Sequence, residues 1–209
     1  MTAIKIEQGY AAWGLWLKWV VASSSGWTAS FILSISAIGA VVQALWGDPD
    51  TVLAEGTLAF HTALTLLFTL SGLGYGVAQW LVLRRLIAGS KWWPFATGVG
   101  FMVAAALFGV IALAGVKEIM VNEVIHNVVA GAGAGIAQSL ILRRQVRVAG
   151  WWVLVNIIGF LLAGAGINRL VVAAGGNEAI GGILGVTVMS MFTGAALVWL
   201  LQQPTIERT

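Results

Sequence analysis

The segment GVAQWLVLRRLIAGSKWWPFATGVGF (residues 76–101) is followed by a near copy of itself, GIAQSLILRRQVRVAGWWVLVNIIGF (residues 135–160). The two segments lie 59 residues apart and align without a gap. More than ten of the 26 aligned positions are identical or nearly so, among them glutamine, Arg-Arg, Trp-Trp and Gly-Phe. Similarity at a fixed offset indicates an internal structural repeat. The two segments therefore bear first on how the chain is built.

The composition is that of a membrane protein. Of 209 residues, 59% are hydrophobic and 9% are charged, whereas roughly 25% of a soluble domain is charged. Lipid must therefore solvate most of the surface. The chain has no cysteine, which excludes disulfides, thiolate catalysis and Cys-ligated zinc or iron–sulfur clusters. The net charge is +3, but the basic residues lie in short clusters beside apolar runs, as orientation signals do, so we expect no nucleic-acid partner.

Six apolar runs are each near the ~20 residues that a helix needs to cross a bilayer. No alternation of period two accompanies them, so we expect helices rather than a barrel. The predicted spans are Trp19 to Trp46, Leu58 to Leu83, Phe95 to Val116, Val128 to Leu142, Trp152 to Ala173 and Ala179 to Leu201. The fourth is the shortest, and an earlier start near Val121 stays open. No signal-peptide pattern precedes the first run, so we expect this helix to be retained.

The loop charges predict the orientation. Six crossings place both termini on one side of the membrane, together with nine of the eleven basic residues: Lys5, Lys18, Arg84, Arg85, Lys91, Arg143, Arg144, Arg147 and Arg208. The opposite side carries Lys117 and Arg169 with Asp48, Asp50, Glu55, Glu118, Glu123 and Glu178. Short cytoplasmic loops carry an excess of Lys and Arg. The N and C termini and both Arg-Arg loops are therefore predicted to be cytoplasmic.

The repeat extends beyond the two quoted segments and defines a helical hairpin. A tryptophan followed seven residues later by a Gly-aromatic pair occurs three times, at Trp19, Trp93 and Trp152. The three copies cover residues 19–85, 93–144 and 152–203. Repeats in one orientation are related by an axis along the membrane normal. We therefore predict one all-α membrane domain, residues 1–209, with six transmembrane helices built from three parallel two-helix repeats.

The Arg-Arg pairs and the tryptophans near them are candidate contact residues. Arginine at the cytoplasmic end of a helix can bind lipid phosphates and the free carbonyls of the helix terminus; the alternative is a basic surface that docks a partner or an anionic lipid. Indole settles at headgroup depth, which predicts an aromatic belt. The alternative is a stacking surface for a flat pigment or quinone. The candidates for partner or lipid contact are Arg84, Arg85, Arg143, Arg144, Trp92, Trp93, Trp151 and Trp152.

Glycine and a few polar residues are expected to hold the helices together. The 27 glycines are clustered in the apolar runs, where small residues let helix backbones approach closely. The alternative is a flat glycine surface that accepts a pigment ring or a neighbouring subunit. Gln79 and Gln138 are repeat equivalents and are expected to form interhelical hydrogen bonds. Arg169 is expected to reach the membrane interface.

His61 and His126 are the chain's two histidines, and imidazole can bind haem iron or chlorophyll magnesium. They lie 23 and 17 residues before their Arg pairs, so they would differ in depth by about 9 Å at 1.5 Å per residue. This difference argues against a symmetric bis-histidine haem, and interfacial hydrogen bonding is the alternative. We predict no metal site. The candidate cofactors are chlorophyll, carotenoid and lipid.

The predicted spans carry no acidic or basic residue at their centres, where proton relays and ion-coupled sites have them. No sequence motif of a metalloprotease, P-loop nucleotide hydrolase or α/β-hydrolase is present. We therefore expect a protein that is not an enzyme.

The repeated pattern GxAQxLxLRR, WW and GF resembles a family of uncharacterised multispanning bacterial membrane proteins of cyanobacteria and other phototrophs. The resemblance covers Trp13 to Gln203. It implies no activity and no site residue, but it favours a photosynthetic setting in a bacterial inner or thylakoid membrane.

Three functions follow as expectations. The first is a non-enzymatic accessory or scaffold subunit that packs through glycine-rich helices against other integral membrane subunits and holds lipid or pigment. The second is a small-solute binding or transport protein. The third is a redox protein linked to haem or quinone. A polar cavity on the axis of the bundle would favour transport, whereas a dry axis and a lipid-facing glycine surface would favour the subunit.

Overall fold

The computed structural model describes residues 10–54, 56–115 and 119–203, and this part of the chain contains helices and no β-strand. The elements are α1 (Tyr10–Trp46), α2 (Pro49–Val52), α3 (Leu58–Leu83), η1 (Ser90–Trp92), α4 (Trp93–Leu113), α5 (Ile119–Leu142), α6 (Trp151–Leu161), η2 (Leu162–Asn168), α7 (Arg169–Ala173) and α8 (Glu178–Leu201). Six helices are long and apolar enough to cross a membrane, with α6, η2 and α7 forming one of them. The predicted all-α class with six candidate spans is thus confirmed.

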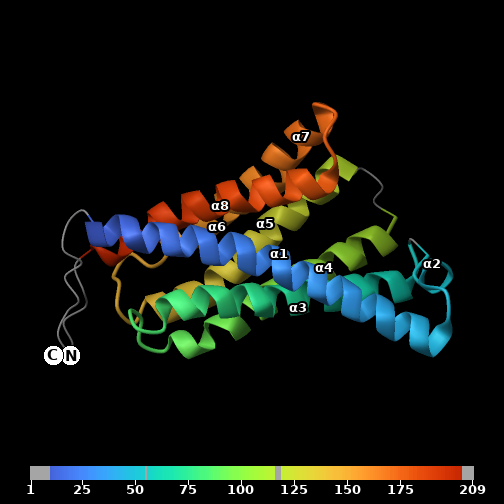
Figure 1. The fold of residues 1–209 in the computed structure, drawn as a ribbon, viewed down its shortest axis with the longest axis horizontal. Helices are drawn as coiled ribbons and strands as arrows, with labels where there is room; N and C mark the ends of the chain where they lie inside the picture. Colours follow the sequence, from blue (N-terminus) through green and yellow to red (C-terminus); the bar gives the residue numbers. More distant parts are fainter. Residues whose placement is uncertain (1–9, 55, 116–118, 204–209) are drawn as a thin grey trace.

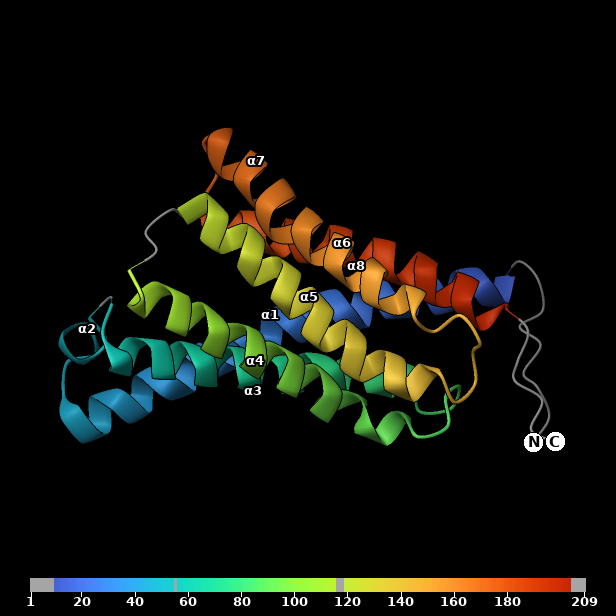
Figure 2. The same cartoon turned by 180° about the vertical axis from the view of Figure 1, so that it is seen from behind.

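The six spans form a closed bundle. Each span packs against the next one along the chain, and α8 returns to pack against α1. We call the end at which α1 begins and α8 ends the terminal end, and the end that carries α2 and the α7–α8 link the distal end (Figure 1). The helices diverge toward the distal end, where α1, α3 and α4 turn away from α5, α7 and the start of α8 (Figures 1 and 2).

Local sequence signals fix the ends of several helices. The Thr57 hydroxyl accepts a hydrogen bond from the Phe60 amide at the start of α3, and the Asn177 side chain accepts one from the Ile180 amide at the start of α8. Such caps satisfy amides that have no partner within the helix. Gly175 follows α7 with a φ of 86°, a left-handed conformation that glycine adopts without steric cost. The distal turn between α7 and α8 therefore depends on this glycine.

Two helices begin nine residues earlier than the hydropathy predicts. Helix α1 begins at Tyr10 rather than at Trp19, and α5 begins at Ile119 rather than at Val128, closer to the alternative start near Val121. The first turns of α5 contain Glu123 and other polar residues, which lower the hydropathy without interrupting the helix. Helix propensity differs from apolarity, because Glu is a good helix former. Val116, the predicted end of the third span, lies outside the described residues.

The bundle presents apolar side chains outward along all six spans, including Leu33, Leu70, Val110, Ile136 and Leu170. This surface is suited to lipid, and no span carries more than two charged residues in its apolar window. The buried residues fall into two clusters. One cluster lies near the terminal end around Trp19, Trp93 and Trp152, and the other surrounds Tyr75 and Phe101 nearer the centre.

Candidate functional site

Three tryptophans meet on the axis of the bundle near the terminal end. Trp19 of α1, Trp93 of α4 and Trp152 of α6 are at most 1% exposed. Their ring centroids lie 6.2, 6.0 and 6.0 Å apart, and the rings meet at steep angles. Edge-to-face and tilted aromatic pairs contribute about 0.5–1.5 kcal/mol beyond the burial of their area. We call these residues the tryptophan triad, and it closes the axis at this level.

Two glutamines hold two members of the triad in place. The Trp93 indole N–H donates to Gln79 Oε1 at 2.8 Å, and Gln79 Nε2 donates to Ser23 Oγ at 3.3 Å. The Trp152 indole N–H donates to Gln138 Oε1 at 2.7 Å, and Gln138 Nε2 donates to Thr97 Oγ1 at 2.8 Å. Each glutamine thereby joins three helices. The predicted interhelical hydrogen bonding of Gln79 and Gln138 is confirmed.

The third member of the triad has a different partner. The Trp19 indole N–H donates to Thr193 Oγ1 on α8 at 3.1 Å. Leu197 lies on α8 at the offset of 59 residues from Gln138 and is fully buried. Thr193, one helical turn from Leu197, supplies the acceptor instead. This bond joins the first span to the last, and with the glutamine bonds it forms a hydrogen-bonded series from α8 through α1, α3, α4 and α5 to α6.

A second aromatic layer lies next to the triad. Phe101 packs against Trp27 and Phe160, with centroid distances of 5.1 and 5.3 Å. Tyr75 contacts Trp27 and Phe101 from α3, at 5.8 and 6.4 Å. Three of these four side chains come from the helices that also carry the triad. The two layers together fill the terminal half of the axis with aromatic rings.

Glycines bring neighbouring helices into backbone contact. A Cβ added at Gly76 of α3 would lie 2.6 Å from the Pro94 Cα of α4, and one added at Gly131 of α5 would lie 2.6 Å from the Ile157 Cα of α6. No side chain fits at these distances. These glycines pack inside the bundle rather than on its lipid-facing surface, so they are not available to a partner subunit. Gly182, by contrast, has open space around it.

The candidate contact residues divide into two groups. Arg84, Arg85, Arg143 and Arg144 are exposed near the terminal end, and Trp92 and Trp151 are each 55% exposed. Trp93 and Trp152 are buried in the triad, so the expectation that they contact lipid or a partner is wrong for these two. In each Trp-Trp pair the first indole points outward and the second lies in the core, because adjacent residues of a helix are about 100° apart.

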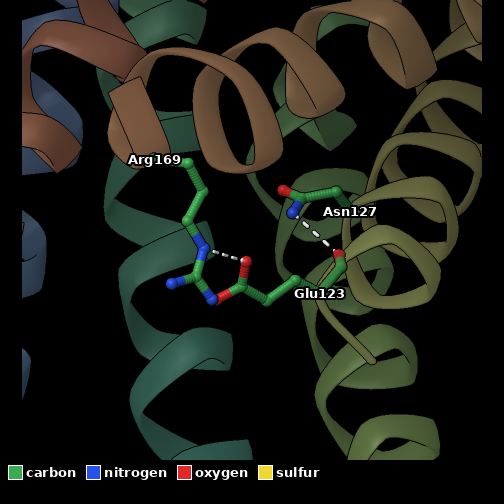
Figure 3. A network of polar contacts seen from close by, with 3 residues as sticks. All are labelled: Glu123, Asn127 and Arg169. Carbon is green, nitrogen blue, oxygen red and sulfur yellow. Dashed lines mark hydrogen bonds and ion pairs between the residues drawn. The ribbon is translucent and has the colours of Figure 1, made fainter. Parts of the chain in front are cut away.

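The distal half contains a polar contact between α5 and α7. Arg169 Nε donates to Glu123 Oε2 at 2.7 Å, and Arg169 also forms an ion pair with Glu123 Oε1 (Figure 3). Asn127 Nδ2 donates to the backbone oxygen of Glu123 at 2.8 Å. The sequence predicts only that Arg169 reaches the membrane interface, and the structure adds a carboxylate partner for it. The Arg169 side chain is 43% exposed and that of Glu123 34% exposed, so water screens this pair.

The segment η2 is a π-helix of seven residues. Such segments are rare in proteins, and many of those that occur lie at functional sites. Asn168 ends it, and the Asn168 side-chain oxygen is buried without a hydrogen-bond partner in the described part of the chain. This oxygen faces Gly181 of α8, where an added Cβ would collide with it. A polar atom is therefore held in an apolar contact between the fifth and sixth spans.

Both histidines lie in the distal half. His61 is 7% exposed, and neither of its ring nitrogens has a hydrogen-bond partner among the described residues. His126 lies between Phe68 and Phe108, with centroid distances of 5.4 Å to each ring, and its Nδ1 is buried without such a partner. A buried polar atom without a partner costs roughly 1–3 kcal/mol. The two side chains face different neighbours, as their different depths predict.

The surroundings of His61 do not fit a haem or chlorophyll. Both ring nitrogens have less than 1 Å² of accessible area, and the Gly109 backbone of α4 lies against the His61 side chain, where an added Cβ would be 3.2 Å from the His61 Cβ. A macrocycle needs an open face beside its ligand. Within residues 10–54, 56–115 and 119–203, no group of three or more His, Asp or Glu side chains could hold a metal ion.

Comparison of the chain with protein-family models, with curated proteins and with solved structures gave no match.

The sequence contains a signal for the triad that a hydropathy profile does not report. Gln79 precedes Trp93 by 14 residues, and Gln138 precedes Trp152 by the same distance. A hydrogen-bonding side chain repeated at one spacing from a tryptophan predicts a buried pair, because a buried indole N–H requires an acceptor. For Asn168 and the π-helix we find no such signal.

Proposed function

We propose that this protein is a non-enzymatic accessory or scaffold subunit of a larger membrane complex. In this proposal three parallel hairpins, residues 19–85, 93–144 and 152–203, form the bundle, and the terminal end faces the cytoplasm. The observation that carries the proposal is the closed axis. Two aromatic layers and the hydrogen bonds of Gln79, Gln138 and Thr193 fill the terminal half, where a transport pathway would need polar space.

The partner surface in this proposal is the outside of the terminal end. Trp92, Trp151 and the two Arg-Arg pairs are exposed there, whereas Gly76 and Gly131 pack within the bundle. Aromatic residues and arginine are enriched where proteins bind one another. The resemblance to phototroph proteins makes a photosynthetic complex of a bacterial inner or thylakoid membrane the first partner to test, with pigment or lipid held at the contact.

The test is purification of the tagged protein in mild detergent, followed by native electrophoresis and an absorption spectrum across the visible range. We expect co-migration with a large complex. The variant Trp92→Ala with Trp151→Ala should release the protein from that complex, and Gly182→Ala serves as the matched control. A particle of only monomer or trimer mass in every preparation would contradict the proposal.

A second candidate, small-solute binding, is favoured by the distal half. His61, His126 and Asn168 all have buried polar atoms there that have no partner among the described residues. A solute that forms hydrogen bonds would satisfy such atoms. Equilibrium dialysis of candidate solutes against wild type and His61→Leu tests this candidate, which predicts retention by wild type alone.

A further inference from the structure

Helices α1 and α3 form a groove of about 730 Å³ on the outside of the bundle, near the terminal end. Most of its lining is apolar, including Val21 and Ala22 of α1 and Ala78 and Leu81 of α3. Ser25 also lines it, but its hydroxyl donates to the Val21 carbonyl of its own helix at 2.6 Å. The groove therefore offers a hydrocarbon chain an apolar path along the bundle.

Positive charge gathers at one end of this groove. Lys18 of α1 and Arg84 and Arg85 at the end of α3 line it, and all three side chains are exposed. The one ion pair in the described part of the chain joins Arg169 to Glu123. No carboxylate of the described residues therefore neutralises the three cations of the groove. Guanidinium groups bind phosphate through paired hydrogen bonds, and Lys adds a point charge. The charged end thus matches a phosphate.

The other two hairpins supply an internal comparison. When Trp19, Trp93 and Trp152 are aligned, larger or uncharged side chains occupy three of the lining positions in the second and third hairpins, whereas Ala22 and Ala78 align with Ala96 and Ala137 of the second. The replacements are Trp92 and Trp151 for Lys18, Phe95 and Leu154 for Val21, and Val99 and Ile158 for Ser25. The third hairpin also has Gln202-Gln203 in place of the Arg pair. The second hairpin also has cations beside both helices, Lys91, Arg143 and Arg144, but the first alone combines such cations with the smaller side chains of Val21 and Ser25.

We propose that this groove binds one anionic phospholipid. Its phosphate contacts Lys18, Arg84 and Arg85, and an acyl chain lies along Val21, Ala22 and Ala78. The charged end of the groove adjoins its apolar lining, just as the charged headgroup of a phospholipid adjoins its acyl chain. A free phosphate would contact the charged end alone. The inference rests on the membrane orientation of the proposed function, but it requires no partner subunit.

The test counts lipids on the purified protein. We would reconstitute it into vesicles of phosphatidylethanolamine and phosphatidylglycerol, extract it in mild detergent, and measure retained phosphatidylglycerol by native mass spectrometry. We expect one phosphatidylglycerol per chain, and excess inorganic phosphate should leave it in place. Each basic residue near an anionic headgroup contributes about fivefold in affinity. Lys18→Gln with Arg84→Gln should therefore lower the affinity for phosphatidylglycerol by about 25-fold, and the purified variant should lose most of its retained lipid.

Two further variants make the result specific. Lys91→Gln with Arg147→Gln removes the same charge outside the groove and should retain the lipid. Val21→Phe with Ser25→Val keeps all charges but inserts the side chains of the second hairpin, and it should expel the lipid. Equal retention by all variants, or equal loss in the control, would overturn the proposal. The proposal would also be overturned if the groove-filling variant released a protein subunit while its lipid count was unchanged. Because purified protein is used, isolation as a monomer would contradict the scaffold proposal and leave this test intact.

Discussion

The terminal and distal halves of the bundle differ in how their helices pack and in how their buried polar groups are bonded. In the terminal half, each indole of the tryptophan triad has a hydrogen-bond acceptor, and the axis is filled by aromatic rings. In the distal half, the helices diverge, one span changes to a π-helix, and buried nitrogens of His61 and His126 have no partner in the described residues, whereas nearer the terminal end and the centre this is true only of the smaller Ser24 and Ser71 hydroxyls. Satisfied buried polar groups specify one arrangement, whereas unsatisfied ones destabilise it.

This difference suggests that the two halves have different roles. The terminal half supplies the stability that holds six spans together, and the distal half is where binding or rearrangement would cost least. Regions with few satisfied contacts open at lower free energy than the core. Substitutions in the terminal half should therefore have the larger effects on unfolding, and four comparisons test this expectation.

The largest effect is expected from the triad. Trp152→Ala removes a fully buried indole and leaves a cavity beside Trp19 and Trp93, which should lower the free energy of unfolding by about 3–5 kcal/mol. Trp151→Ala changes the neighbouring residue, whose indole is 55% exposed, and should cost less than about 1 kcal/mol. Unfolding in SDS titrations measures both. Equal costs would mean that the triad is not the core.

A close helix contact should give the next largest effect. Gly131→Ala brings a methyl group to 2.6 Å from the Ile157 Cα, so α5 and α6 must separate at a cost of about 2–3 kcal/mol. Gly182→Ala has nothing within 4 Å and should be neutral or stabilising by up to about 1 kcal/mol, because Ala is the better helix former. The same titrations apply. A Gly131→Ala protein as stable as Gly182→Ala would refute the contact.

The glutamine hydrogen bonds should contribute less than packing. Gln138→Leu leaves the Trp152 indole N–H without its acceptor, at a cost of about 1–3 kcal/mol. Hydrogen exchange of that N–H, followed by NMR, should accelerate, while the Trp93 N–H bonded to Gln79 should exchange as before. Gln202→Leu, at an exposed position, is the matched control. An unchanged exchange rate of the Trp152 indole N–H would mean that Gln138 is not its acceptor.

The smallest effect is expected from the ion pair of the distal half. Glu123→Gln removes the charge that pairs with Arg169, but both side chains are partly exposed and therefore screened. The melting temperature should fall slightly at low salt and match wild type at high salt. A loss as large as that of Gln138→Leu, independent of salt, would mean that the distal half is as tightly held as the terminal half.

Hydropathy predicted the helical class and the six candidate spans because it reports on lipid exposure, and the equivalence of Gln79 and Gln138 in sequence predicted their shared role. Six candidate spans and the hydrogen bonds of Gln79 and Gln138 are present. The burial of Trp93 and Trp152 was not predicted, because hydropathy assigns both indoles of a Trp-Trp pair to the interface. Which one faces the core depends on the helix phase relative to its neighbours, and the pattern of Gln79 and Gln138 contains that information.

The distal half could not be predicted in the same way. The partnership of Glu123 with Arg169 depends on how α5 and α7 lie relative to each other, which no local pattern specifies. The π-helix at residues 162–168 depends equally on tertiary contacts, such as the close approach of Gly164 to the Asn127 side chain of α5.

The central claim is that the terminal half of the axis is closed to water. The chain has no cysteine, so a single cysteine can be introduced without removing others. Ser190 of α8 is fully buried, whereas Ala88 in the α3–α4 loop is exposed. In open membrane sheets treated with a small water-soluble maleimide, Ser190→Cys should remain unlabelled while Ala88→Cys reacts rapidly. Labelling of Ser190→Cys at a rate near that of Ala88→Cys would contradict the account, because water would then reach the axis.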